Sequence, residues 1–405
     1  MEKKLLYIYL GGAISSNSSG VQKKVFSKIK NINGLGCFCK GVSFSNEIKE
    51  EKQVNEFFTV IPFQKNKRKF FNSLFQQKLL INSVELYLKE NIGEFTHVLF
   101  RYPLASRSLL RLVKRFPDKI IFEHNTKEIE ELKLNAKAFR KALSFSLKPG
   151  YFIFLLELGY LSFLQEIVLG KKIFKYAKSG VAVTQEIAKY EMQRNSEYNV
   201  SVCSNGIDVA QTTLITPIIF DGTELKLFML LGSSNDWSGV DRLVKSVAEY
   251  KGDCTIKVDL IGALEDKDIA LISQLRLGEM ISVLPPLTTD ALNEKLDCYH
   301  LGVGSLCAFR KGLNEASSLK TREYLSRGCG VIVGYEDTDF NASKDFEGFY
   351  MKVPANESLI DFNAVIDFTH KLFEDKEYPI KIRELALKRI DTKVKMKELI
   401  DYLDN

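Results

Sequence analysis

Short apolar runs alternate with amphipathic stretches along the first half of the chain. The apolar runs predict buried strands at residues 4–10, 97–102, 119–124 and 180–184. Between them, apolar positions that recur at helical spacing predict helices at 21–32, 70–90, 104–115 and 126–145. Strands separated by helices in this way indicate a parallel sheet whose crossover connections lie on its faces.

The same alternation restarts in the second half. Strand-like runs occur at 225–232, 257–262, 281–285, 300–305 and 330–335, with a helix near 239–250. The stretch 205–223 between the two series contains Gly206, Pro217 and Gly222 and shows no clear period, which is typical of a linker. A chain of 405 residues also suits two domains. We therefore expect an α/β protein with Rossmann-like domains at 1–205 and 206–380.

The last segment, 381–405, predicts a helix that packs back across both domains. Its apolar residues recur at loosely helical spacing, at Ile382, Leu385, Ile390, Val394, Leu399 and Leu403.

The net charge of +6 is divided unevenly between the halves. Residues 1–205 hold 33 Lys and Arg against 18 Asp and Glu, which gives +15, and residues 206–405 hold 24 against 33, which gives −9. We expect the first domain to face an anionic partner, such as a membrane surface or a lipid-diphosphate-linked acceptor. No feature indicates a nucleic-acid partner.

The cysteines and the start of the chain favour a cytoplasmic protein. Seven scattered cysteines show no metal-ligand spacing, as expected for free thiols in a reducing compartment. The apolar run Leu5–Leu10 follows two lysines but is too short for a signal peptide and precedes no cleavage site, so we expect a first strand.

The most apolar region, 151–170, leaves two alternatives open. Glu157, Gln165 and Glu166 interrupt it, which argues against a transmembrane helix. It predicts either a buried helix or a helix that lies on the cytoplasmic face of the inner membrane. In the second alternative the lysines that follow, Lys171, Lys172, Lys175 and Lys178, would meet lipid phosphates.

The strongest candidate site lies between residues 310 and 332. Ser317 and Ser318 can cap a short helix from about Leu319 to Arg327 that stops at Gly328. Free amides at such a helix start, next to Lys320 and Arg322, form a natural diphosphate site. The flanking carboxylates, Glu315 before the helix and Glu323 within it, can accept hydrogen bonds from sugar and ribose hydroxyls.

Glu315, seven intervening residues, Glu323 and then Gly-Cys-Gly-Val-Ile-Val resemble the signature of retaining glycosyltransferases of the GT-B fold, family 4, including those of bacterial surface-polysaccharide synthesis. Gly330 stands where that family usually has proline. The resemblance implies two Rossmann-like domains that face a central cleft, with the C-terminal helix crossing back to the first. It also implies that Glu315 contacts the donor sugar and Glu323 the ribose.

Other segments resemble the same family in the same order. Asn205-Gly206-Ile207-Asp208 is similar to its passage into the second domain, 18–25 to its N-terminal glycine loop, and 228–247 to its first donor-domain strand, loop and helix. His124, at a strand end, stands where the family often has a histidine near the reaction centre. Alternatively, Asn125 and Glu128 form a capping box there.

The resemblance thus implies an enzyme that moves a hexose from a nucleotide-diphosphate sugar to a glycan or lipid-linked acceptor. It implies His124 and Glu315 as catalytic residues. The donor would contact Gly20, Gly232, Ser233, Arg310, Ser318, Leu319, Lys320 and Glu323.

One departure concerns the loop after the first donor-domain strand, 233–239. This loop lacks the arginine and lysine that hold the diphosphate in the family. Either Arg310, Lys311 or Lys320 supplies the missing positive charge, or the chain is a degenerate nucleotide-sugar-binding protein. A nucleotide-sugar 2-epimerase is a further alternative. It is disfavoured because such an enzyme needs several acid/base carboxylates and histidines around the sugar, and the chain has only four histidines.

Missing motifs narrow the function further. The chain has no P-loop and no Gly-x-Gly-x-x-Gly after the first strand, which disfavours an NTPase or a dinucleotide enzyme. No Asp-x-Asp pair stands at the end of a predicted strand. We therefore expect neither a cofactor nor a metal, with cations and helix amides stabilising the leaving diphosphate.

Overall fold

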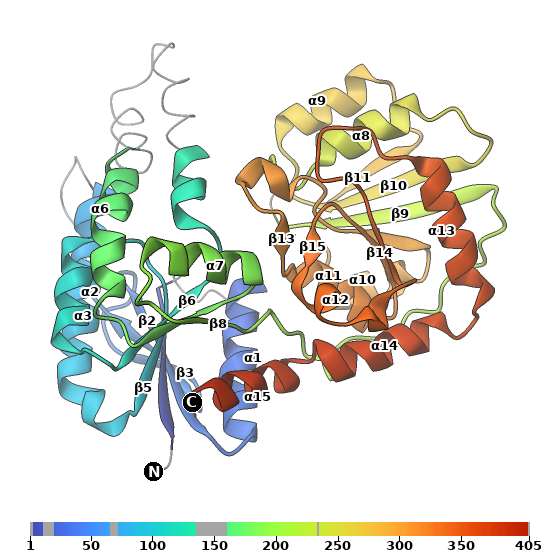
Figure 1. Cartoon of the computed structure of the whole chain (residues 1–405). Helices are drawn as coiled ribbons and strands as arrows, with labels where there is room; N and C mark the ends of the chain where they lie inside the picture. Colours follow the sequence, from blue (N-terminus) through green and yellow to red (C-terminus); the bar gives the residue numbers. More distant parts are fainter. Residues whose placement is uncertain (1–2, 11–19, 65–71, 135–159, 233–234, 404–405) are drawn as a thin grey trace. The chain divides into compact units, whose positions relative to one another are not determined.

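A computed structural model describes residues 3–10, 20–64, 72–134, 160–232 and 235–403. The chain forms two compact units (Figure 1). Unit 1 consists of Met1–Cys203 and Met396–Asn405, and unit 2 of Ser204–Lys395. Both units are α/β, with parallel sheets of the Rossmann type, as the sequence predicts.

The sheet of unit 1 has eight described strands in the order β3-β4-β2-β1-β5-β6-β7-β8. Neighbouring strands are parallel except β3 and β4. The strands are β1 (Lys4–Tyr9), β2 (Phe38–Ser45), β3 (Lys52–Asn55), β4 (Phe58–Pro62), β5 (His97–Arg101), β6 (Ile120–His124), β7 (Ser179–Ala182) and β8 (Val200–Val202). The four predicted strands are confirmed as β1, β5, β6 and β7.

Strand β2 escapes a search for apolar runs because its buried positions include small polar residues. Ser43 and Ser45 are almost fully buried. A Cβ atom at Gly41 would lie 2.3 Å from Ile29 Cδ1 and 2.4 Å from Phe58 Cδ2, so glycine lets helix α1 and strand β4 approach closely.

Helices cover both faces of this sheet, as expected for crossover connections (Figure 1). They are α1 (Gly20–Gly34), α2 (Asn72–Asn91), α3 (Arg107–Arg115), α6 (Ser162–Phe174) and α7 (Gln185–Arg194). Of the helix predicted at 126–145, residues 128–134 are helical and 126–127 are not, and residues 135–145 lie outside the described residues.

The C-terminal helix α15 (Thr392–Tyr402) returns to unit 1. Met396 and Leu399 are buried in the same hydrophobic core as Leu5 and Tyr7 of β1. Lys3 Nζ donates a hydrogen bond to Ile400 O at 2.9 Å. The preceding helix α14 (Tyr378–Arg389) belongs to unit 2.

Unit 2 has a six-stranded parallel sheet in the order β11-β10-β9-β12-β14-β16. Its strands are β9 (Glu224–Leu231), β10 (Thr255–Gly262), β11 (Ile281–Leu284), β12 (Leu301–Val303), β14 (Gly330–Val333) and β16 (Tyr350–Lys352). Its other helices are α8 (Val240–Glu249), α9 (Asp266–Gln274), α10 (Thr289–Leu296), α11 (Leu319–Ser326), α12 (Thr338–Ala342) and α13 (Phe362–Glu374). A small second sheet pairs β13 (Glu315–Ala316) with β15 (Glu336–Asp337).

Each large sheet has one point at which the strand order reverses. In unit 1 it lies between β1 and β5, and in unit 2 between β9 and β12. Ligands of open parallel sheets bind beyond the carboxyl ends of the strands at such a point. The ends of β9 and β12 therefore mark where to search unit 2 for a ligand site.

Candidate functional site

The loops that follow β9 and β12 are bonded to each other. Leu306 N donates to Ser238 O at 3.0 Å, and Cys307 N donates to Trp237 O at 3.2 Å. Gly239 has φ +77°, and a Cβ atom there would lie 2.8 Å from Leu306 Cβ, so glycine is required by both conformation and space. The predicted contact Gly232 directly follows β9, and Ser233 lies outside the described residues.

Helix α11 begins just beyond this edge of the sheet. It starts at Leu319 and ends before Gly328, whose φ is +77°, which confirms the predicted helix. Ser318 occupies the N-cap position but makes no capping hydrogen bond. Ser317 Oγ instead accepts from Asn205 N at 2.8 Å. The predicted serine cap is therefore wrong.

The missing cap leaves the amide end of α11 open. The first N–H groups of an α-helix have no partner within the helix. Within the described parts of the chain, nothing accepts a hydrogen bond from the N–H groups of Leu319 or Lys320. Such a helix start attracts an anion through its N–H groups and its dipole.

Lys320 adds a cation to this helix start. It is half-buried, and its Nζ has no hydrogen-bond or ion-pair partner among the described residues. Burial lowers the pKa of Lys320 to about 8. The side chain is thus charged at neutral pH but lacks a counter-ion.

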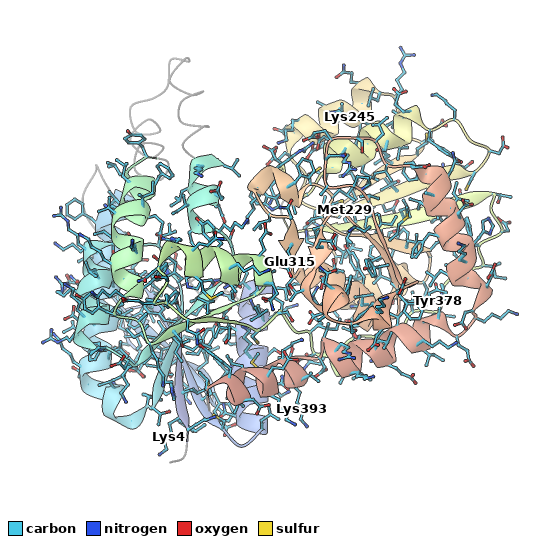
Figure 2. The ribbon with its side chains drawn as sticks, viewed as in Figure 1. Lys4, Met229, Lys245, Glu315, Tyr378 and Lys393 are labelled. Carbon is cyan, nitrogen blue, oxygen red and sulfur yellow. The ribbon has the colours of Figure 1, made fainter. Side chains whose placement is uncertain are left out.

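The two carboxylates of the signature flank these amides along the sequence. Glu315, labelled in Figure 2, forms part of β13 and is 9% exposed. Its carboxylate accepts a hydrogen bond from Thr338 Oγ1 at 2.7 Å. Glu323 lies three residues after Lys320, on the same side of α11. Its Oε1 atom is 3.2 Å from Arg327, and its side chain remains 30% exposed.

The hydrogen bonds of Arg310 argue against its predicted contact with a diphosphate. Its five N–H groups donate to Asp241, Glu357 and the carbonyl of Asp236, at distances of 2.5–3.0 Å. A guanidinium has five donors, so none remains for a ligand in this arrangement. Lys311 Nζ lies 4.8 Å from the centre of the Trp237 ring. Lys320 is therefore the strongest of the three proposed cations.

An Asp-x-Asp pair does occur after β14, at Asp337 and Asp339, which corrects the sequence analysis. β15 ends at Asp337, two residues beyond the segment predicted as strand. Both carboxylates are buried and bonded to the guanidinium of Arg322. Lys395 Nζ also lies 2.7 Å from Asp339 Oδ1, so two cations balance the two carboxylates within the protein.

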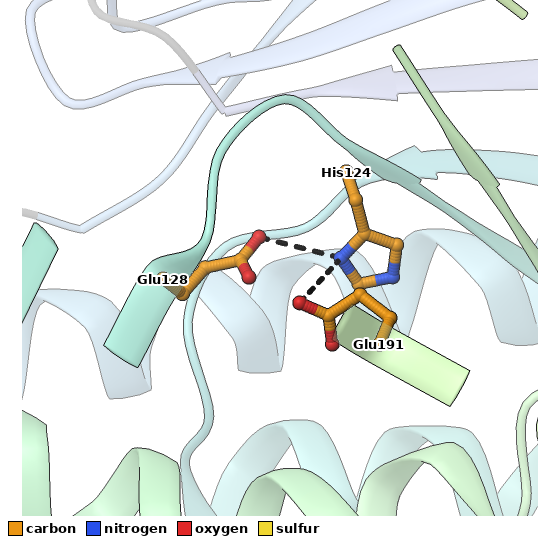
Figure 3. Close-up of side chains that lie close together, drawn as sticks. All are labelled: His124, Glu128 and Glu191. Carbon is orange, nitrogen blue, oxygen red and sulfur yellow. Dashed lines mark hydrogen bonds and ion pairs between the residues drawn. The ribbon is translucent and has the colours of Figure 1, made fainter. Parts of the chain in front are cut away.

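His124 ends β6 in unit 1 and is completely buried. Its Nδ1 atom lies 3.3 Å from Glu128 Oε1 and 4.0 Å from Glu191 Oε1 (Figure 3), while Nε2 lies 3.0 Å from the Tyr198 hydroxyl. The Tyr102 ring is centred 5.1 Å away. Because both nitrogens have partners and no ring surface is exposed, this conformation gives no support to the predicted catalytic role.

Arg194 balances the acidic groups around His124. It lies 2.9 Å from Glu191 Oε2, 3.7 Å from Glu128 Oε2 and 2.5 Å from Glu166 Oε1. Burial would raise the pKa of Glu128, but its hydrogen bond to His124 and the Arg194 charge hold that pKa below its ordinary value. Burial and the Glu128 charge hold the pKa of Glu191 well above its ordinary value.

The ligand types and spacing at this cluster would suit a metal ion. Side-chain atoms of His124, Glu128 and Glu191 lie within 4.8 Å of one another. However, Arg194 already contacts both carboxylates, and a guanidinium beside a dication would be repelled. The residues therefore fit an internal charge network better than a metal centre.

A second buried charge cluster in unit 1 has no counterpart in the sequence analysis. Glu123 accepts from Tyr7 Oη at 2.7 Å, Lys28 Nζ at 3.0 Å and Lys24 Nζ at 3.3 Å. Burial and the Lys28 charge lower the pKa of Lys24 to about 7. The cluster bonds helix α1, which begins at Gly20, to the end of β6. Its only sequence signal is a glutamate inside an apolar run.

The structure thus places the predicted site residues in two groups. One group comprises Glu315, Ser318, Leu319, Lys320 and Glu323, which lie within one segment of unit 2, with Gly232 at the end of the strand adjacent to β12. Gly20 and His124 belong to unit 1.

Comparisons with known proteins give structural matches only. No protein-family model and no curated protein matches the chain. Among solved structures, it is similar to sucrose-phosphate synthase from Thermosynechococcus elongatus, with 12% identity, a TM-score of 0.64 and 99% of each chain covered. It is also similar to WaaG, a glycosyltransferase involved in lipopolysaccharide biosynthesis, with 11% identity, a TM-score of 0.62 and 98% of this chain and 99% of that one covered.

A third match is Anabaena HepE in complex with UDP-glucose, with 12% identity, a TM-score of 0.60 and 99% of each chain covered. The chain has the GT-B fold. This fold consists of two Rossmann-like domains, and the match extends over almost the whole chain. At such low identity the likeness establishes the GT-B architecture alone.

The raised pKa of Glu191 gives a prediction for stability. A folded-state pKa above the unfolded value of about 4.3 contributes stability that is complete below that value and is lost as the pH rises through the folded pKa. Glu191→Gln, which mimics the protonated form, should therefore gain stability relative to wild type as the pH is raised from 5 to 8, by up to about 1.4 kcal/mol for each pH unit between the two pKa values.

Urea unfolding at several pH values measures this difference. Glu186→Gln is the matched control, because Glu186 is a partly exposed residue of the same helix whose carboxylate pairs with Lys127. A constant difference between Glu191→Gln and wild type over this pH range would contradict the prediction.

Proposed function

We propose that the chain is a glycosyltransferase that moves a sugar from a nucleotide-diphosphate sugar to a separate acceptor. The observation that supports this most strongly is the open amide end of α11 with the unpaired cation of Lys320, flanked by Glu315 and Glu323, on a GT-B fold. Structural matches add support, since HepE has been solved with UDP and with UDP-glucose.

In this proposal the diphosphate of the donor binds at the start of α11. The N–H groups of Leu319 and Lys320 donate to its oxygens, and the Lys320 ammonium supplies the positive charge. Gly232 leaves open backbone at the end of β9, since no atom of the described residues, its chain neighbours apart, lies within 4 Å of where its Cβ would stand. Glu323 accepts from the ribose hydroxyls, and Glu315 from hydroxyls of the transferred sugar.

The proposed reaction retains the anomeric configuration and uses no metal. As the glycosidic bond to the nucleotide breaks, negative charge develops on the departing diphosphate, where the helix amides and Lys320 stabilise it. The acceptor hydroxyl attacks from the same face, and its proton passes to the departing phosphate oxygen. Glu315 holds the sugar in the orientation that this attack requires.

Replacing Glu315 tests the sugar site. Glu315→Ala should lower the rate of transfer at least about tenfold, because a hydrogen bond that orients the reacting sugar is lost. The assay measures nucleotide release and product with a panel of nucleotide sugars and acceptors, and circular dichroism checks the fold. Glu336→Ala, on the paired strand β15, is a matched control. A wild-type rate for Glu315→Ala would remove this residue from the sugar site, and nucleotide binding without turnover by the wild type would indicate a degenerate protein.

The pKa of Lys320 predicts how nucleotide binding depends on pH. Because only the protonated amine attracts a diphosphate, raising the pH from 7 to 9, through the pKa of about 8, should weaken UDP binding by about tenfold. Lys320→Arg keeps its charge throughout and should lose this dependence. Isothermal titration calorimetry measures both affinities. The same pH dependence in Lys320→Arg would show that another group causes it.

The proposed acceptor is a glycan carried on a lipid at the cytoplasmic face of a membrane, as in surface-polysaccharide assembly. Helix α6 supports this choice. Its inner face consists of Glu166, Gly170, Ile173 and Phe174. On its outer side, Leu164, Ile167 and Val168 are 40–56% exposed, and Lys171, Lys172 and Lys175 follow them in exposed positions. No helix among the described residues is long and apolar enough to cross a membrane.

Exposed apolar residues next to lysines suit an anionic lipid surface, into which the apolar side chains insert while the lysines meet lipid phosphates. This arrangement favours the membrane-surface alternative over a buried helix for the described part of the segment, 160–170. Residues 151–159 lie outside the described residues.

Vesicle binding tests this surface. The wild type should float with vesicles that contain phosphatidylglycerol and not with pure phosphatidylcholine, and high salt should weaken the binding. Replacing both Ile167 and Val168 with serine should reduce flotation several-fold. Leu387→Ser, which changes an exposed apolar residue of α14 in unit 2, should leave it unchanged. Equal flotation of the two variants would exclude α6 as the lipid-binding surface.

A further inference from the structure

Glu315 is oriented by a residue that the signature does not include. Its Oε1 atom accepts the hydrogen bond of Thr338 Oγ1 at 2.7 Å. Thr338 begins helix α12, directly after strand β15, which pairs with the β13 strand of Glu315 in register. The orientation of the Glu315 carboxylate therefore depends on where the segment 337–339 lies.

That segment is held by one buried guanidinium. Arg322 is completely buried, and its two terminal nitrogens donate to both oxygens of Asp337 and to Asp339 Oδ2. Thr338 lies between these two aspartates. Arg322 itself is a residue of α11, between Lys320 and Glu323, so it connects the helix of the proposed diphosphate site to the residue that orients Glu315.

Asp339 also bonds to both ends of unit 2. Ser204 Oγ donates to Asp339 Oδ1 at 2.9 Å, and Lys395 Nζ donates to the same oxygen at 2.7 Å. Ser204 and Lys395 are the first and last residues of unit 2, where the chain passes from one unit to the other.

We call the segments 204–209 and 390–395 the two passages. Asn205 joins the first passage to the α11 segment. Its carbonyl accepts from Arg322 Nε at 3.1 Å, its N–H donates to Ser317 Oγ at 2.8 Å, and its Nδ2 donates to Ser317 O at 2.5 Å. The second passage is paired with the first, because Ile207 and Thr392 are linked through Ile207 O and Thr392 N at 2.9 Å.

We propose that Arg322, Asp337 and Asp339, named here the Arg322 cluster, position Glu315 through Thr338 and couple that carboxylate to both passages of the chain. With Lys395, the cluster contains two cations and two carboxylates, so its formal charge is balanced. Removal of one member leaves a buried charge unpaired. The bonded elements therefore keep one common arrangement. This inference rests on the proposed function for the role of Glu315, whereas the coupling to the passages does not.

Thr338→Val tests the positioning role. The variant keeps the shape of the side chain but cannot donate to Glu315, so kcat should fall about tenfold while the KM for the donor changes less than twofold. Thr338→Ser restores the hydroxyl and should restore kcat. Thr369→Val is the matched control, because the buried Thr369 hydroxyl donates to Val365 O in its own helix. Wild-type kcat in Thr338→Val, or no rescue by serine, would overturn the positioning role.

Hydrogen exchange of Asp339→Asn tests the coupling without any ligand. Loss of the carboxylate should speed amide exchange several-fold in three separate segments, 204–209, 315–322 and 390–395, because each is bonded to the cluster. Asp345→Asn is the control, since Asp345 pairs with Arg389 at the surface and should affect only its own surroundings. Unchanged exchange in either passage would overturn the coupling. Absence of transfer by the wild type would instead refute the proposed function.

Discussion

A buried guanidinium that holds several carboxylates organises each unit. In unit 1, Arg194 bonds to Glu166 and Glu191 and lies near Glu128, which joins helices α6 and α7 to the segment after β6. In unit 2, Arg322 bonds to Asp337 and Asp339 and joins α11 to α12. A buried charge without a partner is very costly. The elements that provide these partners are therefore fixed relative to one another at the carboxyl side of each sheet, where ligands of such folds bind.

The sequence was sufficient to predict what depends on local pattern. The buried strands β1, β5, β9 and β14 each contain a continuous apolar run, and α11 has the predicted bounds although its predicted serine cap is absent. The sequence was insufficient where contacts between residues far apart in the chain determine which side chains are buried. In the sequence, Glu166 interrupts an apolar helix. In the structure it is buried, because Arg194 and the Tyr102 hydroxyl bond to it there. The apolar residues Leu164 and Ile167 are exposed instead.

The candidate site shows the same division. Glu315, Lys320 and Glu323 could be identified from spacing, because they belong to one segment. The sequence could not show which cation, Arg310 or Lys320, is available to bind the diphosphate. That depends on Asp241 and Glu357, which come from distant parts of the chain and occupy donors of Arg310. A cation that binds an exchangeable anion must not be neutralised permanently by the protein. Among the proposed cations, Lys320 meets this condition.

The ionic character of the Arg322 cluster bears on how the site works. A buried ion pair gives little net stability compared with well-packed apolar side chains, so stability alone does not account for it. Its bonds are directional, however, and Asp339 Oδ1 accepts from Ser204 and Lys395 at once. Apolar contacts would tolerate small sliding movements between these segments, whereas directional bonds to a single oxygen do not. The cluster is therefore suited to transmit a change at Glu315 to both passages as one discrete step, as bistable packed elements do.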